Sequence, residues 1–334
     1  MTTSLTRPRK VAAVVAATVA AMLGAAACSS SSSGKTVNLV AYSVPKPAYD
    51  ALAAAFAKTP AGKDFKLNAS YGPSGTQRDA VLAGQQADYV AFSVEPDMTA
   101  LVPDKVDPSW NSGPTKGLVS DSVVVITVRA GNPLHITGWD DLIKPGVQIV
   151  TPDPASSGSA KWNILAAYSH VLSQGGTATD ASNYLKDFFG HVVSRAASGS
   201  DAMQQFLNGT GNVLISYEDE AIDARQAGES VDYLVPDQTV LIQNPAAVTK
   251  GAPQLAKDFL AFAESEQGQE IFASKGFRPV LPGTKVGTIE GANDPSNPFP
   301  QPSQLTTIDD LGGWDVVNDK FFGDNGIVTK IEAS

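Results

Sequence analysis

The chain has 334 residues, a hydrophobic content of 43% and a formal net charge of −10. This length is too great for one small hydrophobic core and suits two domains, and the composition is that of a folded globular protein. The negative charge excludes nucleic acid as an expected partner, because nucleic-acid-binding proteins present basic patches.

The N-terminus has the pattern of an export signal, expected over residues 1–27. Basic residues precede an apolar run of 13 residues, 11–23, which is too short to span a bilayer as a stable helix. Small residues then lead to Cys28, the single cysteine of the chain, which resembles the lipidated cysteine of bacterial lipoproteins. The alternative is ordinary cleavage before an unmodified cysteine. With lipidation, residues 28–35 are a lipid-bearing, flexible serine-rich tether at the extracytoplasmic face of the cell membrane.

From residue 36 onward the sequence predicts alternating strands and helices. Apolar runs predict strands over residues 37–42, 65–71, 87–92, 122–128, 147–151, 213–217 and 240–248. The last of these is expected to break at Asn244-Pro245. Helical spacing of apolar residues predicts helices over 49–56, 76–82, 161–172, 180–189, 219–226, 253–263 and 267–275. The alternation implies an α/β fold whose mostly parallel sheet is covered on both faces.

The strand-to-helix junction over residues 151–163 is the most informative segment. A Pro-interrupted turn leads into a run of five small residues and then into a helix that opens at about residue 161. Small residues let a ligand reach the free N–H groups of a helix start, where the helix dipole favours an anion. The hydroxyls of Ser156, Ser157 and Ser159 add hydrogen-bond donors. We interpret this junction as an oxyanion site that needs no cationic side chain.

Three other junctions have similar chemistry, at residues 42–45, 71–77 and 196–201. Ligands of open α/β sheets bind beyond the carboxyl ends of the strands, so these junctions are expected to converge on one small anion. The alternative interpretation of each junction is an ordinary helix N-cap with its turn, since Ser and Gly are common there.

The sequence does not contain the complete motifs of the enzyme classes considered. Residues 72–76 do not form G-x-S-x-G, and residues 43–46 fit S-x-x-K without the S-D-N or K-T-G companions of that motif. His135, His170 and His191 are expected to be structural or surface residues. The sequence contains neither H-E-x-x-H nor a Cys/His cluster, so no catalytic activity, metal or cofactor is predicted.

Several segments together resemble the bacterial sulfate/thiosulfate-binding proteins that feed ABC importers. These segments are residues 71–77, 129–133, 139–147, 149–154, 156–163, 213–221 and 311–314. The resemblance covers residues 36–331 and implies a periplasmic-binding-protein type II fold, with two α/β lobes and a ligand in the cleft between them. In each lobe a mixed, mostly parallel sheet is expected to be flanked by helices.

The chain is expected to divide into two lobes joined by a hinge. Lobe 1 is predicted to comprise residues 36–121 with 247–334, and lobe 2 residues 122–246. Crossovers near residues 122–128 and 241–248 are the predicted hinge.

The resemblance also implies how sulfate is held: fully dehydrated, by backbone N–H groups at helix starts and by a few hydroxyl or indole donors. The matching positions are Ser43, Ser74, Ser157, Gly158, Ser159, Gly199 and Tyr217. Tyr217 stands where the family often has Trp, and Lys161 where it commonly has an Arg that braces peptide groups behind the anion. Glu218 is expected to brace the cleft. The implied partners are sulfate, the membrane subunits of an ABC permease and the membrane itself through the lipid anchor, with the protein a monomer.

Other oxyanions remain open as ligands: thiosulfate, molybdate, tungstate or phosphate, with a secreted serine hydrolase as the rival class. Hydrogen phosphate carries a proton, so a selective phosphate site usually offers a carboxylate acceptor, which would repel sulfate. The segments around Ser43, Ser74 and 157–159 place no acidic residue at the expected contacts, although Asp153 and Asp201 are nearby in sequence. A carboxylate pointing into the cleft would therefore contradict the sulfate hypothesis.

Overall fold

The computed structural model describes residues 35–333, so the predicted export signal and the predicted lipid attachment at Cys28 lie outside the described part. The strands are β1 (Thr36–Tyr42), β2 (Lys66–Gly72), β3 (Tyr89–Ala91), β4 (Leu118–Arg129), β5 (Ile149–Pro152), β6 (Val192–Ala196), β7 (Val213–Tyr217), β8 (Val231–Leu234), β9 (Gln238–Val248) and β10 (Gln304–Thr306). The α-helices are α1 (Lys46–Phe56), α2 (Ser74–Leu82), α3 (Glu95–Thr99), α4 (Gly158–Ser173), α5 (Ala178–Gly190), α6 (Gly199–Leu207), α7 (Glu218–Gln226), α8 (Gln254–Ala263), α9 (Glu266–Ser274), α10 (Trp314–Val317) and α11 (Ile327–Glu332).

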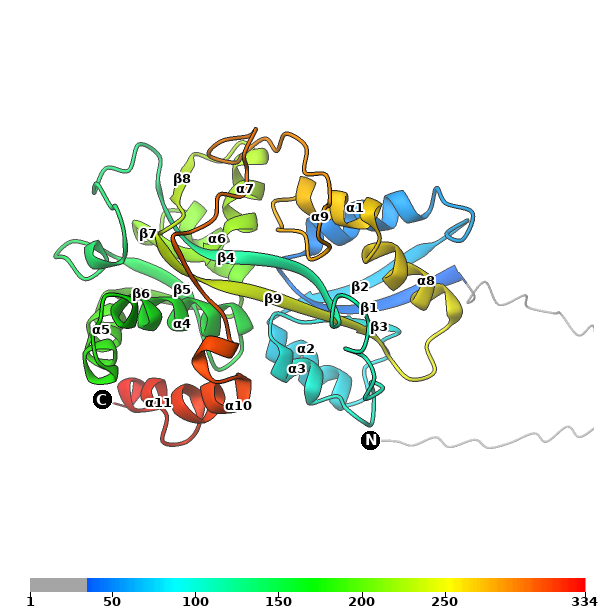
Figure 1. Cartoon of the computed structure of the whole chain (residues 1–334), viewed down its shortest axis with the longest axis horizontal. Coiled ribbons are helices and arrows are strands. Elements are labelled where there is room, and N and C mark those ends of the chain that lie inside the picture. The colour runs from blue at the N-terminus through cyan, green and yellow to red at the C-terminus, as the bar shows by residue number, and fades with distance from the viewer. Residues whose placement is uncertain (1–34, 334) are drawn as a thin grey trace, which may run out of the picture. The chain divides into compact units, whose positions relative to one another are not determined.

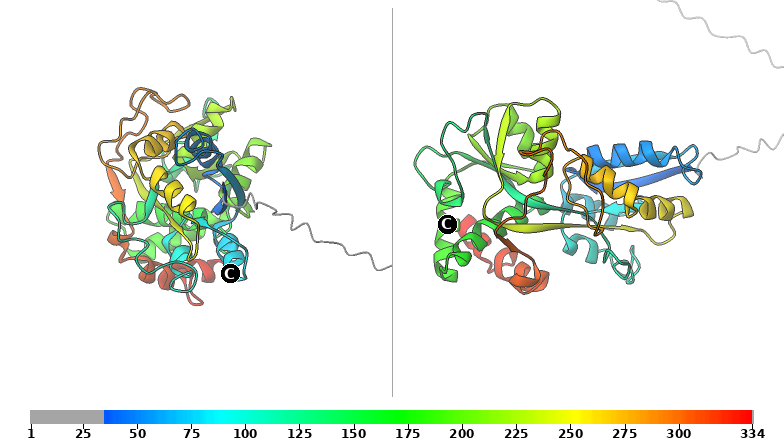
Figure 2. Two further views of the ribbon diagram at one scale, coloured as in Figure 1. Left: turned by 90° about the vertical axis from the view of Figure 1, so that its right-hand side faces the viewer. Right: turned by 45° about the horizontal axis from the view of Figure 1, so that its top comes forward.

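The strands lie in the order β2-β1-β3-β9-β4-β7-β5-β6, with β10 beside β9 and β8 beside β4. The β1–β2, β1–β3, β5–β6 and β5–β7 pairs are parallel, whereas β3–β9, β4–β9 and β4–β7 are antiparallel. Helices cover both faces of each half, as Figures 1 and 2 show. The predicted α/β architecture, with mixed sheets flanked by helices, is confirmed.

Strands β1 to β3 belong to what we call the first half of the molecule, and β5 to β7 belong to the second half. Two long strands, β4 and β9, connect these halves (Figure 1). The first part of β4 pairs with β9 from Leu118 to Val123, and its second part pairs with β7 from Val124 to Val128. The last residues of β9 pair with β3. Because both strands pass without interruption from one half to the other, they lie where the sequence predicts the hinge.

The expected break of β9 at Asn244-Pro245 is wrong, because the strand continues to Val248. Opposite Pro245 the register of β4 shifts between Leu118 and Ser120. Proline lacks an N–H, and such a ladder irregularity is where a strand tolerates it. Helix α4 starts at Gly158, earlier than the expected residue 161.

The tail after residue 303, which is assigned to lobe 1 from the sequence, makes contacts with β9 and α4. Strand β10 pairs with the start of β9. The Trp314 and Phe321 rings make edge-on contacts with Trp162 and Tyr168 of α4, at centroid distances of 4.9 and 4.7 Å. Phe321, Trp162 and Tyr168 are buried and Trp314 is half-buried, and complete burial of such a side chain contributes about 1.5–3 kcal/mol, so these contacts stabilise the placement of the tail.

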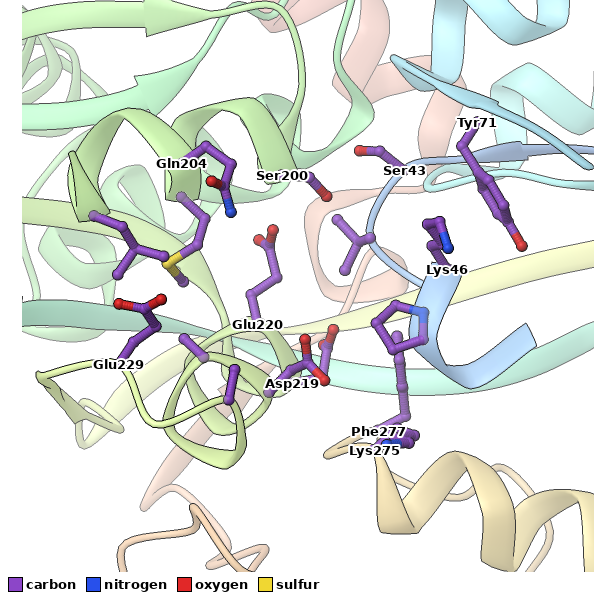
Figure 3. A pocket seen from close by; sticks show the side chains of 17 residues that line it. Ser43, Lys46, Tyr71, Ser200, Gln204, Asp219, Glu220, Glu229, Lys275 and Phe277 are labelled. Carbon is purple, nitrogen blue, oxygen red and sulfur yellow. The ribbon is translucent and has the colours of Figure 1, made fainter. Parts of the chain in front are cut away.

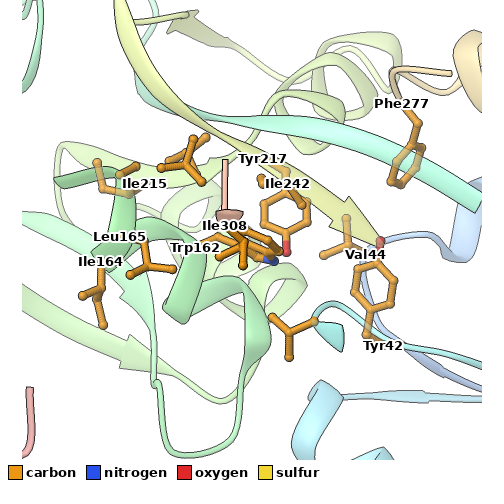
Figure 4. Packing of buried hydrophobic residues seen from close by; sticks show 14 of the residues in the cluster. Tyr42, Val44, Trp162, Ile164, Leu165, Ile215, Tyr217, Ile242, Phe277 and Ile308 are labelled. Atoms are coloured by element: carbon orange, nitrogen blue, oxygen red, sulfur yellow. The ribbon is translucent and has the colours of Figure 1, made fainter. Parts of the chain in front are cut away.

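Aromatic packing also fills the region between the halves. Figure 4 shows the side chains of Trp162 and Tyr217 close together, with Ile242 of β9 and Ile308 of the tail beside them. All four side chains are buried, and Trp162 and Tyr217 are among the largest fully buried ones. This core holds the starts of α4 and α7 in fixed positions, because it packs directly behind them.

Candidate functional site

The start of α4 carries the features predicted for an anion site. Ser157 is the N-cap residue and has an extended backbone, yet its side chain makes no capping hydrogen bond. The first N–H groups of a helix have no partner inside the helix, so those of Gly158 and Ser159 point outward with the Ser157 hydroxyl. All three residues are buried. Donors buried without helical partners suit a bound anion.

The start of α6 lies against the start of α4. A Cβ atom added to Gly199 would lie 3.0 Å from Ser159 Oγ and 3.1 Å from Val44 Cγ2, so segments that are distant in the chain meet here. The Ser198 N-cap side chain accepts the Asp201 N–H, which leaves the N–H groups of Gly199 and its neighbour at the helix start uncapped. A side chain at position 199 would fill the space between the two helix starts.

Hydrogen bonds across the molecule hold these helix starts against residues of the first half. The Gly75 N–H donates to the Ser156 carbonyl at 3.0 Å. Trp162 Nε1 donates to the Ser93 carbonyl at 2.9 Å, and the hydroxyls of Ser93 and Tyr217 lie 2.7 Å apart. The structure is therefore a closed arrangement in which both halves meet at the helix starts.

The structure brings together most of the residues that the resemblance implied. The Tyr217 hydroxyl lies 2.7 Å from Ser93 Oγ, and Ser93 lies against Gly158. Ser159 Oγ lies beside Gly199. We call the residues gathered here the anion site: Ser43, Ser157, Gly158, Ser159, Gly199 and Tyr217. Burial raises the pKa of the Tyr217 hydroxyl, so that side chain keeps its proton and remains a hydrogen-bond donor.

Ser74 lies at the edge of this group with its hydroxyl already engaged. It donates to Asp97 Oδ2 at 2.6 Å and accepts the Ser93 N–H at 3.0 Å. A hydroxyl has one hydrogen, so none remains for an anion in this arrangement. Burial raises the pKa of Asp97, and the hydrogen bond from Ser74 and the charge of Arg78 oppose that rise.

Lys161 is directed toward the C-terminal tail. Its Nζ atom donates to Asn318 Oδ1 at 3.3 Å and lies 4.9 Å from the centre of the Phe322 ring. Burial lowers the pKa of Lys161, and the Asp97 carboxylate acts in the opposite direction. These contacts connect α4 to the tail.

Glu218 forms a buried ion pair with Arg278. Arg278 Nε lies 2.7 Å from Glu218 Oε2, and Nη2 lies 3.1 Å from Oε1. The backbone of Arg278 also exchanges two hydrogen bonds with Asp121 of β4. The pair therefore joins the start of α7 to one of the two long connecting strands.

Sequence reasoning missed Glu220, an acidic residue that lies beside the anion site. Its Oε2 atom would lie 3.2 Å from a Cβ on Gly199 and has no hydrogen-bond partner in the described structure. Asp153 and Asp201, the residues that the sequence flags, are instead engaged in local turns with Ala155 and Ser198. The acidic first turn of α7 was the available signal, but no spacing rule shows which of its side chains turns toward α6.

A cavity of about 310 Å³ opens beside the anion site, between the two halves (Figure 3). Ser43 and Lys46 line it from the first half, and Ser200, Asp219 and Glu220 from the second. In Figure 3 the Glu220 carboxyl projects toward Ser200. We call this space the cleft cavity, and Ser43 is the anion-site residue that lines it.

Among residues 35–333, no cluster of His, Cys, Asp or Glu has the arrangement of a metal site. The same residues include no helix that is both long and apolar enough to cross a membrane.

Two α/β halves, two continuous connecting strands and a cleft lined by helix starts define a two-lobed binding protein. The family described as bacterial extracellular solute-binding protein matches residues 37–278. A sulfate-binding protein of Synechococcus elongatus is 38% identical over 309 residues, which cover 89% of this chain and 86% of that protein. A thiosulfate-binding protein of Pseudomonas aeruginosa is 29% identical over 87% of this chain and 90% of its own.

Among solved structures, the sulfate-binding protein SubI from Mycobacterium tuberculosis superposes with a TM-score of 0.80 and 42% identity, covering 86% of this chain and 99% of its own. The chain belongs to the bacterial extracellular solute-binding proteins, in the group of the sulfate- and thiosulfate-binding proteins. The resemblance drawn from the sequence is confirmed.

Proposed function

We propose that this protein is an extracytoplasmic sulfate receptor that delivers sulfate to an ABC import permease and has no catalytic activity. The start of α4 carries the proposal: Ser157, Gly158 and Ser159 present a hydroxyl and two helix-start N–H groups in a buried place. The sulfate-binding proteins to which the chain is similar support the same ligand. Because the chain as a whole is negative, local dipoles and hydrogen bonds must supply the attraction.

The proposed ligands are the backbone N–H groups of Ser43, Gly158, Ser159 and Gly199 with the hydroxyls of Ser157 and Tyr217. Six hydrogen bonds to a charged group contribute about 9–18 kcal/mol before the losses of freedom on binding. A micromolar site needs about 8 kcal/mol, so this set is sufficient without a cationic side chain. Ser74 belongs to the set only if its hydroxyl turns away from Asp97, and otherwise it positions Ser93.

Because the proposed ligands come from two lobes, we expect the lobes to close over the anion. Ser43 comes from lobe 1, which we propose to comprise residues 36–121 with 247 to about 288, and the other five ligands come from lobe 2. We place the chain after about residue 288 with lobe 2, because Asn293 bonds to Tyr233 and the later tail packs on α4. Sulfate contacts both lobes in this scheme and so stabilises the closed form. Anchoring through a lipidated Cys28 and docking of the closed form on a permease complete the proposal.

Isothermal titration calorimetry with Ser157→Ala tests the site. Removal of one hydrogen bond to a charged group, about 1.5–3 kcal/mol, lowers the sulfate affinity about 10- to 150-fold. Ser173→Ala is the matched control, because Ser173 ends the same helix and donates to the His170 carbonyl. Unchanged sulfate affinity in Ser157→Ala, with normal folding, would contradict the site. Parallel titration with thiosulfate, molybdate, tungstate and phosphate identifies the preferred anion, and tighter binding of any of these would replace sulfate in the proposal.

A further inference from the structure

Glu220 is buried where the anion site meets the cleft cavity. It lies in the first turn of α7, and its Oε2 atom shares the space beside Gly199 with Ser159 Oγ and Val44 Cγ2. That oxygen has no hydrogen-bond partner in the described structure. A buried polar atom without a partner is rare in folded proteins and calls for a ligand, a water or a proton-linked role.

The charge state of this carboxyl decides what it does next to a dianion. An ionised carboxylate would repel sulfate, whereas a protonated carboxyl has an O–H to donate. Burial raises the pKa of Glu220 to about 8; a hydrogen bond from the Tyr217 backbone opposes this rise, and the charge of Asp223 adds a smaller contribution to it. At neutral pH the group is therefore mostly a neutral acid, which removes the conflict between a carboxyl in the cleft and sulfate as the ligand.

Other titratable groups face Glu220 from its own helix and across the cleft cavity. They are Lys46, Tyr217, Asp219, Asp223, Glu229 and Lys275. Of the acidic members, Asp223 disfavours ionisation of Glu220 through its charge. The two lysines line the same cavity but form no ion pair with Glu220 within the described residues.

We propose that Glu220 is a further ligand of the anion, a protonated carboxylic acid that donates its hydrogen to sulfate and so couples sulfate binding to its own protonation. This inference rests on the proposed function. Loss of the proton at high pH turns the donor into an acceptor and places a negative charge beside the anion. Sulfate affinity then falls, while hydrogen phosphate, which has a hydrogen to donate, loses less. Glu220 thus determines specificity between the two anions as a function of pH.

Calorimetric titration of the mature protein with sulfate from pH 6 to pH 9.5, at constant ionic strength, tests the coupling. The wild-type affinity is expected to be level near pH 6–7 and to fall by up to about tenfold per pH unit above the pKa of Glu220. Glu220→Gln keeps a donor without a titratable proton, so its affinity stays level across the range. Asp223→Asn, which removes a neighbouring charge, moves the fall to lower pH. Glu229→Gln, at an exposed residue of the same cavity, keeps the wild-type profile.

Proton counting provides a test that needs no variant. Titrations at pH 9 in buffers of different ionisation enthalpy are expected to show uptake approaching one proton per sulfate bound. The inference would be overturned if the wild-type affinity did not change with pH, or if no proton were taken up on binding. It would also be overturned if a folded Glu220→Gln variant kept the wild-type pH profile. Failure of the proposed function looks different, because the wild type would then bind no sulfate even at pH 6.

Discussion

The Gly158→Ala substitution is expected to hinder closure of the cleft without destabilising the fold. In the closed structure a Cβ on Gly158 would lie 2.7 Å from Ser93 Cβ and 2.6 Å from Ser93 Oγ. Gly158 is the first residue of α4 and Ser93 belongs to the other half of the molecule, so the clash arises only when the halves meet. Gly158 has no positive φ, and alanine is a better helix residue than glycine.

The expected loss of sulfate affinity follows from the overlap between the added methyl group and Ser93. Carbon atoms pack at about 3.5–4.0 Å, so the added methyl group is about 1 Å too close to Ser93. Overpacking of this kind costs about 1–3 kcal/mol. If sulfate binding requires the closed form, that cost lowers the affinity about 5- to 150-fold. The free energy of unfolding without sulfate stays the same or rises, because the open form accepts the methyl group.

Sulfate titration measures the affinity, and urea unfolding in the absence of sulfate measures the free energy of unfolding. Gly190→Ala is the control, because a Cβ there at the end of α5 meets no atom within 4 Å. Small-angle scattering with saturating sulfate would show whether the variant remains more extended than the wild type. Wild-type affinity in Gly158→Ala would refute the reasoning, since closure as described leaves no room for the methyl group.

Two further predictions concern buried charges near the connecting strands. Glu218→Gln leaves the Arg278 guanidinium buried without its ionic partner, so urea unfolding should show a loss of about 3–5 kcal/mol, and a loss below about 1 kcal/mol would contradict this role. Burial raises the pKa of Asp121 to about 7, so the native state holds a proton that the unfolded state releases. The free energy of unfolding should therefore fall as pH rises from about 4 to about 7, by at most about 4 kcal/mol from this group. Asp121→Asn should flatten that part of the pH dependence, and equal slopes in variant and wild type between pH 5 and pH 8 would count against it.

The sequence alone determined the α/β class and the chemistry of the helix starts. Apolar runs and helical spacing are properties of short segments, so they predicted most of the strands and helices from residue 36 onward. The small residues of 151–163 likewise predicted a helix start with free N–H donors, because capping and dipole effects act within one turn. The predicted strand break at Pro245 is wrong, because the register shift that accommodates this proline belongs to the neighbouring strand β4.

Only the tertiary structure decided which distant residues meet and which of them are charged. Ser74 faces Asp97, the tail residue Trp314 packs on Trp162, and Glu220 lies beside Gly199, all through contacts between separate elements. Periodicity assigns a residue to a face of its own helix but does not say what covers that face. The protonation of a carboxyl depends on the burial that this covering produces, so no local pattern in the sequence contains it.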